Sequence, residues 1–461
     1  MRRVFTAVLS LTVALAIPSA AAAFSPGAPG LGDPFFPDQG NGGYDALHYD
    51  VAIDYRYDAQ SLRGTVLMTA RATQDLSSFN LDLRGLQVRS VRVNGRFADR
   101  SQAGQELTIT PSGGLRAGRT FTALVEYGGT ATPVVDPDES IEGWIPTPDG
   151  AFVVGEPQGT PGWMPVNDTP RDKATYAFAI TVPKGKTAVA NGKLVSKVTL
   201  GGKTTWLWKE DDPMASYLAT ATNGDFRFWK TTGPGGLPIY NAVDTAFGPE
   251  DQAAADEVLA KQGDIITFFS GLFGPYPYAS AGAIVDDADF VGYALESQGR
   301  ANYDRVPDED TVAHEIAHQW FGNSVTLGSW PDIWLNEGFA TWAEWRWGEE
   351  AGGPTVQDQF DRFYARPPTS SIWSPPVAGL TDPADLFTSS TYIKGAMALQ
   401  ALRVKVGDPA FTQILRAWFA EGRAQTVTTA DFIALAERVS GQELSPFFDT
   451  WLFTAGKPVS W

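Results

Sequence analysis

The sequence contains no cysteine and only three histidines among its 461 residues. The absence of cysteine excludes disulfide bonds, zinc–thiolate sites, thiol nucleophiles and lipidation on cysteine. Basic residues are also few, because 35 lysines and arginines stand against 53 aspartates and glutamates, for a formal net charge of −18. A field of that sign repels phosphate backbones, so we expect no nucleic acid among the partners.

Long apolar runs are missing as well. One short apolar run lies at the N-terminus. Two arginines precede an apolar run over residues 4–17, and Pro18 and a series of alanines follow it. This order is typical of a secretory signal peptide, which we expect over residues 1–23, with cleavage after Ala23. The alternative is an uncleaved membrane anchor, for which the run is short. We therefore predict a secreted protein with no membrane span once the signal is removed.

Composition divides the rest of the chain into three parts. Residues 24–43 are rich in glycine and proline, and we expect them to be a flexible lead-in. Over residues 44–230, short runs of alternating apolar and polar residues are separated by Asn-Gly and Gly-Gly pairs, as in tight hairpins. Over residues 231–461, apolar residues mostly follow helical spacing, with a few strand-like segments between. These patterns predict a β-sheet domain followed by a mostly helical domain.

Two of the three histidines lie four positions apart, in the segment His314-Glu315-Ile316-Ala317-His318. Residues with this spacing project from the same face of a helix, so both imidazoles can reach one zinc ion. Glu315 lies between them, offset around the helix, where its carboxylate can accept a proton from water at the metal. The alternative is a pair of histidines without a metal, which this spacing around a glutamate disfavours. We therefore predict a catalytic zinc site on this helix.

A catalytic zinc site needs a third protein ligand and leaves a fourth position open for water. Glu337 is the candidate, in a predicted helix that starts with Ser329 as its cap and Pro331 in its first turn. If the two helices are antiparallel, the loop over residues 323–328 brings Glu337 back over both histidines. The spacing alone leaves open that Glu337 is an ordinary exposed glutamate.

The run from His314 to Asn323, followed by Trp334-Leu335-Asn336-Glu337-Gly338-Phe339-Ala340, closely resembles the aminopeptidase N family of zinc metallopeptidases, which are gluzincins. The resemblance covers nearly all of the mature chain. It implies a saddle-like β-sheet N-terminal domain, followed by a thermolysin-like catalytic domain, in a short two-domain form without the helical superhelix of larger members. It also implies peptide substrates and one Zn²⁺ per chain, with His314, His318 and Glu337 as ligands and Glu315 as the general base.

The resemblance assigns three further residues. Tyr392 falls where the family has a catalytic tyrosine, and a neutral phenol can donate a hydrogen bond to the oxyanion of the reaction. Glu296 and Glu156 match positions that hold the substrate's α-ammonium, the natural partner of a carboxylate. An ordinary aromatic at a helix start and solvated carboxylates are the alternatives for these three residues. Around the two glutamates the sequence departs from the family pattern at Val154, Tyr293, Leu295 and Ser297.

These features predict a secreted, monomeric zinc aminopeptidase that hydrolyses N-terminal peptide bonds. The altered segment around Glu296 keeps open a zinc endopeptidase or a dipeptide-releasing peptidase. An alternative of another class is a catalytically silent module that binds zinc or peptides, since a fold alone does not settle function.

Another acidic group precedes Glu296, formed by Asp286, Asp287 and Asp289. The spacing of an EF-hand calcium loop does not follow it. We therefore expect a solvated turn here, and we disfavour a calcium site.

Overall fold

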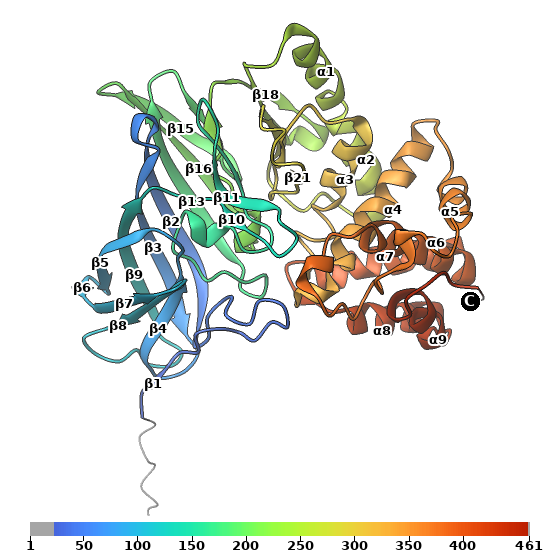
Figure 1. Ribbon diagram of the computed structural model, residues 1–461, viewed down its shortest axis with the longest axis horizontal. Helices are drawn as coiled ribbons and strands as arrows, with labels where there is room; N and C mark the ends of the chain where they lie inside the picture. The colour runs from blue at the N-terminus through green and yellow to red at the C-terminus, as the bar shows by residue number, and fades with distance from the viewer. Residues whose placement is uncertain (1–22, 460–461) are drawn as a thin grey trace, which may run out of the picture.

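The computed structural model describes residues 23–459, and the two halves of this segment differ in architecture. Figure 1 shows the sheets of the first half on one side of the molecule and the helices of the second half on the other. The predicted signal peptide, residues 1–23, lies outside the described residues apart from Ala23. Within the described part of the chain, no helix is both long enough and apolar enough to cross a bilayer.

The first half is built on one large, open sheet. Most neighbouring strands are antiparallel, while the third and fourth in the order below, which pair Phe178 with Val51, run parallel. Side chains alternate between the buried and the solvent-facing side, as the sequence pattern predicts. In spatial order the strands are β15 (Lys193–Leu200), β16 (Lys203–Met214), β13 (Ala174–Pro183), β2 (Tyr44–Arg56), β3 (Ser61–Ala72), β9 (Thr120–Gly129), β5 (Gln87–Val93) and β6 (Arg96–Phe97).

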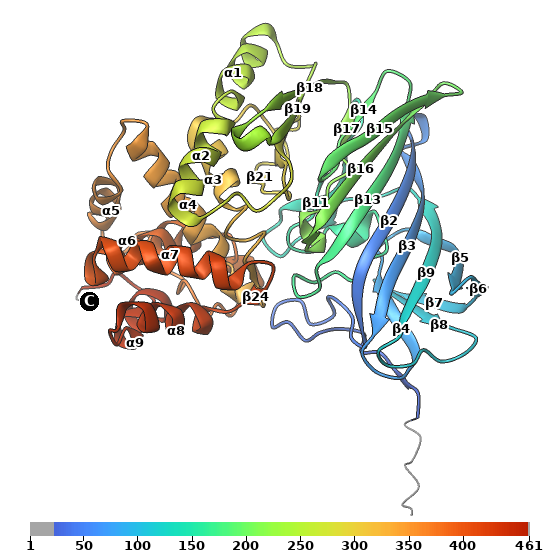
Figure 2. The ribbon, with the colours of Figure 1, turned by 180° about the vertical axis from the view of Figure 1, so that it is seen from behind.

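Two smaller sheets complete this half, and apolar side chains from all three sheets share one core. One sheet has the order β1 (Ser25–Pro26), β4 (Leu76–Asp82), β8 (Glu106–Thr110) and β7 (Asp99–Ala103). The other has the order β10 (Val134–Val135), β11 (Ile141–Pro146), β12 (Ala151–Val154), β17 (Asn223–Gly224) and β14 (Thr187–Ala188). Figure 1 and the opposite view in Figure 2 both show β11 on the side that faces the helical half.

The second half starts with a five-stranded sheet in the order β18 (Phe226–Thr232), β19 (Pro238–Asp244), β20 (Ala281–Val285), β22 (Ala301–Tyr303) and β21 (Ala294–Leu295). The predicted domain boundary after residue 230 falls inside β18, which already pairs with β19. The helices are α1 (Pro249–Leu259), α2 (Gln262–Phe273), α3 (Glu309–Ala317), α4 (Trp334–Glu350), α5 (Val356–Tyr364), α6 (Gly395–Val406), α7 (Asp408–Gly422), α8 (Thr429–Ser440) and α9 (Ser445–Phe448). A parallel pair, β23 (Thr326–Leu327) and β24 (Thr426–Val427), joins the loop after α3 to the loop before α8.

Residues 24–43, which we expected to be a flexible lead-in, are packed against both halves. The buried carboxylate of Asp33 accepts a hydrogen bond of 3.0 Å from the backbone N–H of Trp330. The side chain of Gln39 accepts one of 2.7 Å from the indole of Trp330 and donates one of 3.0 Å to Asp168. Glycine and proline prevent regular structure here, but buried polar contacts fix an irregular segment equally well.

Candidate active site

The two motif histidines lie at the C-terminal end of α3. The side chain of Asp308 caps this helix by accepting a hydrogen bond of 2.8 Å from the backbone N–H of Thr311. His318 comes directly after the last helical residue but keeps helical backbone angles, with φ −55° and ψ −26°. The rings of His314 and His318 therefore share one face, with their centroids 4.8 Å apart.

Glu337 lies in the first turn of α4, which packs against α3. The helix begins later than the sequence predicted. A 3₁₀ turn occupies Trp330–Asp332, and α4 starts at Trp334. Ser329 does not cap this helix, because its hydroxyl donates to the carboxylate of Asp33 at 3.1 Å. The contact with the lead-in thus occupies the hydroxyl that the sequence predicted as the helix cap.

The structure brings the three predicted metal ligands together. Glu337 Oε2 lies 3.2 Å from His314 Nε2 and 3.4 Å from His318 Nε2. A tetrahedral zinc ion with bonds of about 2.0–2.1 Å separates its ligand atoms by about 3.3 Å. Two imidazoles and a carboxylate are a donor set typical of catalytic zinc, and His318 and Glu337 are both buried. The residues present therefore fit a zinc ion.

The carboxylate of Glu315 faces a cavity of about 270 Å³ next to these ligands. Burial raises the pKa of Glu315, and the two histidines offset part of this rise, so that the pKa lies at about 7. Its Oε2 has no hydrogen-bond partner among the described residues. A buried carboxylate with this pKa can accept a proton near neutral pH and release it again.

Tyr392 lines the same cavity. It belongs to a π-helical turn, Ser390–Lys394, that leads directly into α6. Its ring lies 6.0 Å from the ring of His314, with an angle of 26° between the two planes. Burial, with a further contribution from Glu337, raises the pKa of the phenol well above its ordinary value. The phenol is therefore neutral and able to donate a hydrogen bond.

Glu156 and Glu296 reach the cavity from different halves of the molecule. Glu156 follows β12, and Glu296 follows β21, the edge strand of the second sheet. Both side chains are buried, and the Oε1 atom of each lacks a hydrogen-bond partner within residues 23–459. Burial and the nearby Glu296 raise the pKa of Glu156 well above its ordinary value. Buried carboxylates that each carry an unpartnered oxygen favour a cationic group beside them.

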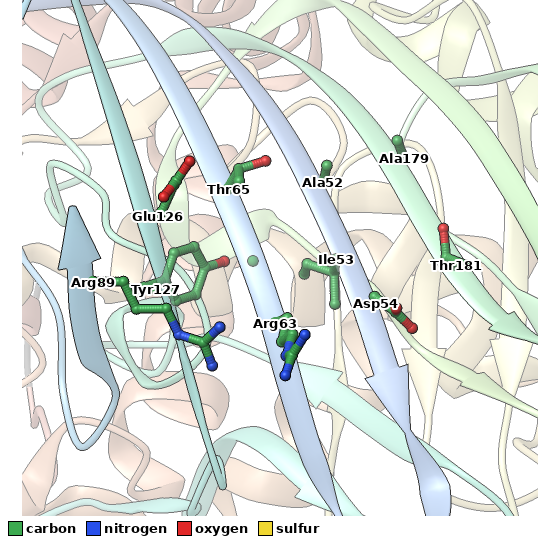
Figure 3. A pocket seen from close by; sticks show the side chains of 11 residues that line it. Ala52, Ile53, Asp54, Arg63, Thr65, Arg89, Glu126, Tyr127, Ala179 and Thr181 are labelled. Atoms are coloured by element: carbon green, nitrogen blue, oxygen red, sulfur yellow. The ribbon is translucent and has the colours of Figure 1, made fainter. Parts of the chain in front are cut away.

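Another hollow lies on the eight-stranded sheet, shown in Figure 3. Its volume is about 330 Å³, and its charged lining includes both Arg63 and Glu126. None of the predicted site residues lines it. The chemistry is therefore assigned to the cavity that contains Glu315 and Glu337.

Both halves of the chain match family models. Residues 45–218 match the peptidase M1 N-terminal domain, and residues 293–451 match the peptidase family M1 domain. Among solved structures, the M1 zinc metallopeptidase from Deinococcus radiodurans is 30% identical with a TM-score of 0.81, over 92% of this chain and 97% of that chain. The chain belongs to the peptidase M1 family. Its predicted family and its predicted fold class, a β-sheet domain before a helical catalytic domain, are thereby confirmed.

Other M1 relatives are longer or carry a ligand. A variant of the Deinococcus radiodurans enzyme bound to a Tyr-Ser-Ala substrate is 30% identical, with a TM-score of 0.82 over 94% of this chain and 98% of that chain. Aminopeptidase M1-D from Oryza sativa subsp. japonica is 28% identical over 64% of this chain. Glutamyl aminopeptidase from Rattus norvegicus is 25% identical over 90% of it. The M1 chain spans 36% of the length of the rice protein and 47% of the rat protein.

Sequence reasoning missed one residue of this M1 site, Glu344. Its carboxylate lies 3.1 Å from His314 Nδ1, and the backbone oxygen of Phe321 lies 3.2 Å from His318 Nδ1. Each histidine thus has an acceptor at Nδ1, which leaves Nε2 free for a metal. The signal was available, because Glu344 follows Glu337 by seven positions and so shares its helix face.

The departures from the family pattern around Glu296 have local partners. Ser297 Oγ accepts a hydrogen bond of 2.7 Å from Asn302, and the hydroxyl of Tyr293 donates one of 2.8 Å to the backbone oxygen of Ile141. The backbone oxygen of Glu296 accepts a bond of 2.7 Å from Asn323, in the loop after α3. The segment is therefore held in place although its sequence differs.

Proposed function

We propose that this M1 chain is a zinc-dependent aminopeptidase that hydrolyses N-terminal peptide bonds, with one zinc ion per chain. The observation that carries the proposal is the pair of buried carboxylates, Glu156 and Glu296, with unpartnered oxygens beside Glu315. The α-ammonium of a peptide supplies the positive charge and the donors that these carboxylates need. An acetylated N-terminus supplies neither.

Each residue has a defined part in this reaction. His314, His318 and Glu337 would hold zinc, which when bound supplies a Lewis acid that polarises a carbonyl and acidifies water. Glu315 accepts the proton of the attacking water and passes it to the leaving amine, a role supported by its pKa of about 7. Tyr392, kept neutral by burial, donates a hydrogen bond to the oxyanion that forms on attack.

An extended peptide can add to the free edge of β21, whose other edge pairs with β22. A peptide that runs antiparallel to β21 has its N-terminus near Glu296, which directly follows the strand. The tripeptide substrate named for the Deinococcus radiodurans variant is consistent with a short, extended peptide. We also propose that the chain is exported, on the basis of the pattern of residues 1–23, and that it acts as a monomer.

The test compares initial rates on matched fluorogenic peptides with free and acetylated N-termini. Both are measured on the zinc-loaded protein and again after chelation. We expect chelator-sensitive cleavage of the free-amine peptides only. The matched control is Glu315→Gln, which keeps all three zinc ligands and should lower kcat by about 10²–10⁴-fold, the usual contribution of a general base.

The other outcomes separate the alternatives. Equal cleavage of acetylated peptides would overturn the exopeptidase proposal and favour a zinc endopeptidase. Release of dipeptides would favour a dipeptide-releasing enzyme. Stoichiometric zinc without turnover of any peptide would favour a binding module.

A further inference from the structure

A second group of carboxylates lies where the two halves of the molecule meet. Asp149 follows β11 in the first half, Asp244 ends β19, and Asp286 follows β20. Because β19 and β20 are parallel and pair Val243 with Val285, the residues that follow these two are neighbours. One oxygen of each of the three carboxylates lies within 4.8 Å of the others. None of the three lines the active-site cavity.

Asp286 is the member of this group that needs a ligand. Its side chain is 1% exposed, so the expectation of a solvated turn is wrong for this residue. Both of its carboxylate oxygens are buried without a hydrogen-bond partner in the described part of the chain. Burial, with Asp244 and Asp149 nearby, raises the pKa of Asp286 well above its ordinary value. Leaving a buried carboxylate unpaired costs free energy, so native proteins pair such groups with a cation or donors.

The neighbouring donors are already directed elsewhere. Lys186 Nζ donates to the backbone oxygen of Asp149 at 2.8 Å and to the carboxylate of Asp225 at 2.6 Å. The hydroxyl of Tyr57 donates to Asn223 at 2.7 Å.

Backbone and hydroxyl donors reach the other two members of the group. Asp244 accepts hydrogen bonds from the backbone N–H groups of Ala246 at 2.9 Å and Asp287 at 3.4 Å. Asp149 accepts from the hydroxyl of Thr147 at 2.9 Å and from the backbone N–H of Asp225. These contacts orient both carboxylates, whereas no donor of the described residues reaches the oxygens of Asp286.

We propose that Asp149, Asp244 and Asp286 bind a calcium ion that joins the β-sheet half to the helical half. The donors are carboxylate oxygens without imidazole or thiolate, which selects a hard cation. Ca²⁺ accepts six to eight oxygens at about 2.3–2.6 Å in flexible geometry, so its opposite ligands lie about 5 Å apart. Mg²⁺ gives up its water reluctantly and demands a regular octahedron, which suits a buried group such as Asp286 less well.

The ion would have a structural role at the domain junction. Asp149 comes from the half that matches the M1 N-terminal domain, whereas Asp244 and Asp286 come from the sheet of the helical half. A shared ion would therefore add a cross-link between the two domains. It also fixes the segment that runs from Asp286 to Val291, a residue in the wall of the active-site cavity.

The test uses the zinc-loaded protein, so that the active-site metal is constant. Calcium is titrated by isothermal calorimetry, and thermal unfolding is recorded with CaCl₂, MgCl₂ or NaCl at equal ionic strength. We expect one saturable calcium site with Kd of about 10⁻⁴–10⁻³ M, the range of extracellular modules. At ten times Kd the stabilisation is about 1.4 kcal/mol, so the unfolding midpoint of a chain of this length should rise by about 1–2 °C.

Three variants make the assignment specific. Asp286→Asn should abolish saturable binding and the calcium-dependent shift, and without calcium it should unfold at a higher temperature than the wild type. Asp149→Asn removes the ligand from the other domain at a half-buried position, and should weaken binding at least tenfold even if Asp286→Asn fails to fold. The matched control is Asp287→Asn, at the exposed neighbouring position, which should bind calcium like the wild type.

Absence of saturable binding in the wild type would overturn the proposal. So would an equal shift with MgCl₂ or NaCl, or unchanged binding in both Asp286→Asn and Asp149→Asn. Because none of these readouts depends on peptide hydrolysis, the calcium site and the proposed aminopeptidase activity can fail separately.

Discussion

At the scale of single residues, the orientation of two imidazole rings determines which of their nitrogens can bind a metal. His314 and His318 both turn Nε2 towards Glu337, since an acceptor at Nδ1 fixes the tautomer of each ring. For His318 this acceptor is a backbone oxygen, which no substitution removes. For His314 it is the side chain of Glu344, which can be changed.

We predict that Glu344→Ala weakens zinc binding by about 10–100-fold, the usual effect of losing an outer partner of a metal ligand. Glu344→Gln should restore part of the affinity, because its amide oxygen still accepts a hydrogen bond. The measurement is competition for zinc against a chromogenic chelator. The control is Glu350→Ala, an exposed residue on the same helix that pairs with Arg346 at 3.3 Å. Equal zinc affinity in Glu344→Ala and the control would contradict the positioning role.

At the scale of elements, the site depends on how closely α4 approaches the start of α6. A Cβ atom on Gly338 would lie 3.0 Å from the backbone carbon of Gly395, so the two backbones touch. Gly338 directly follows the predicted ligand Glu337, and Gly395 comes three positions after Tyr392. Two glycines thus allow the metal ligand and the phenol to face the same cavity.

We predict that Gly338→Ala forces these two elements apart, lowers stability by about 1–3 kcal/mol through overpacking and lowers kcat. Gly348→Ala is the matched control on the same helix, where the nearest atom to an added Cβ lies 3.9 Å away. This control should gain up to about 1 kcal/mol from the better helix propensity of alanine. Urea unfolding measures the change in stability, and peptide hydrolysis measures the change in kcat. If both substitutions change the free energy of unfolding in the same direction, the close approach of the two backbones is not the reason for a glycine at position 338.

At the scale of the whole molecule, buried charges hold the two domains together. Arg300 of the helical half is fully buried, and its guanidinium donates a bond of 3.0 Å to the backbone oxygen of Gly192 in the sheet half. Lys173 of the sheet half donates in return to the backbone oxygens of Asn323 and Ser324, at 3.1 and 2.9 Å. Glu210, in β16, is a buried carboxylate close enough to Arg300 for their charges to interact. The protonation state of Glu210 is therefore coupled to the contact that Arg300 makes between the domains.

This coupling predicts how stability depends on pH. Burial raises the pKa of Glu210 to about 8, from an ordinary value of 4.5. The folded protein thus binds more protons than the unfolded chain between these values, and its stability falls as pH rises through them. Glu210→Gln cannot lose this proton, so it should match the wild type near pH 5 and exceed it near pH 8, by on the order of a few kcal/mol.

Urea unfolding at several pH values measures this difference. The control is Glu126→Gln, which removes an exposed carboxylate of the same domain. A constant difference between Glu210→Gln and the wild type from pH 5 to pH 8 would show that this carboxylate does not control the coupling.

The sequence by itself determined the features that depend on local geometry. The spacing of His314 and His318 fixes a shared helix face, because 3.6 residues per turn is a property of the backbone. The alternation over residues 44–230 predicts a sheet for the same kind of reason, since side chains in a strand alternate between its faces. The helix pattern also made Glu337 a candidate ligand, which the resemblance to a family then assigned. The resemblance alone supplied Tyr392, Glu156 and Glu296, which no local pattern reaches.

Tertiary structure alone decided which of these groups are buried and what they meet. The glycine-rich lead-in is fixed because Asp33 and Gln39 meet Trp330, almost 300 positions later in the sequence. Asp286 is enclosed because the sheet half covers the ends of β19 and β20, whereas its neighbour Asp287 stays exposed. Burial and hydrogen-bond partners are set by contacts between distant segments. A local pattern therefore specifies which face a side chain is on, and the packing of the whole chain specifies what that face touches.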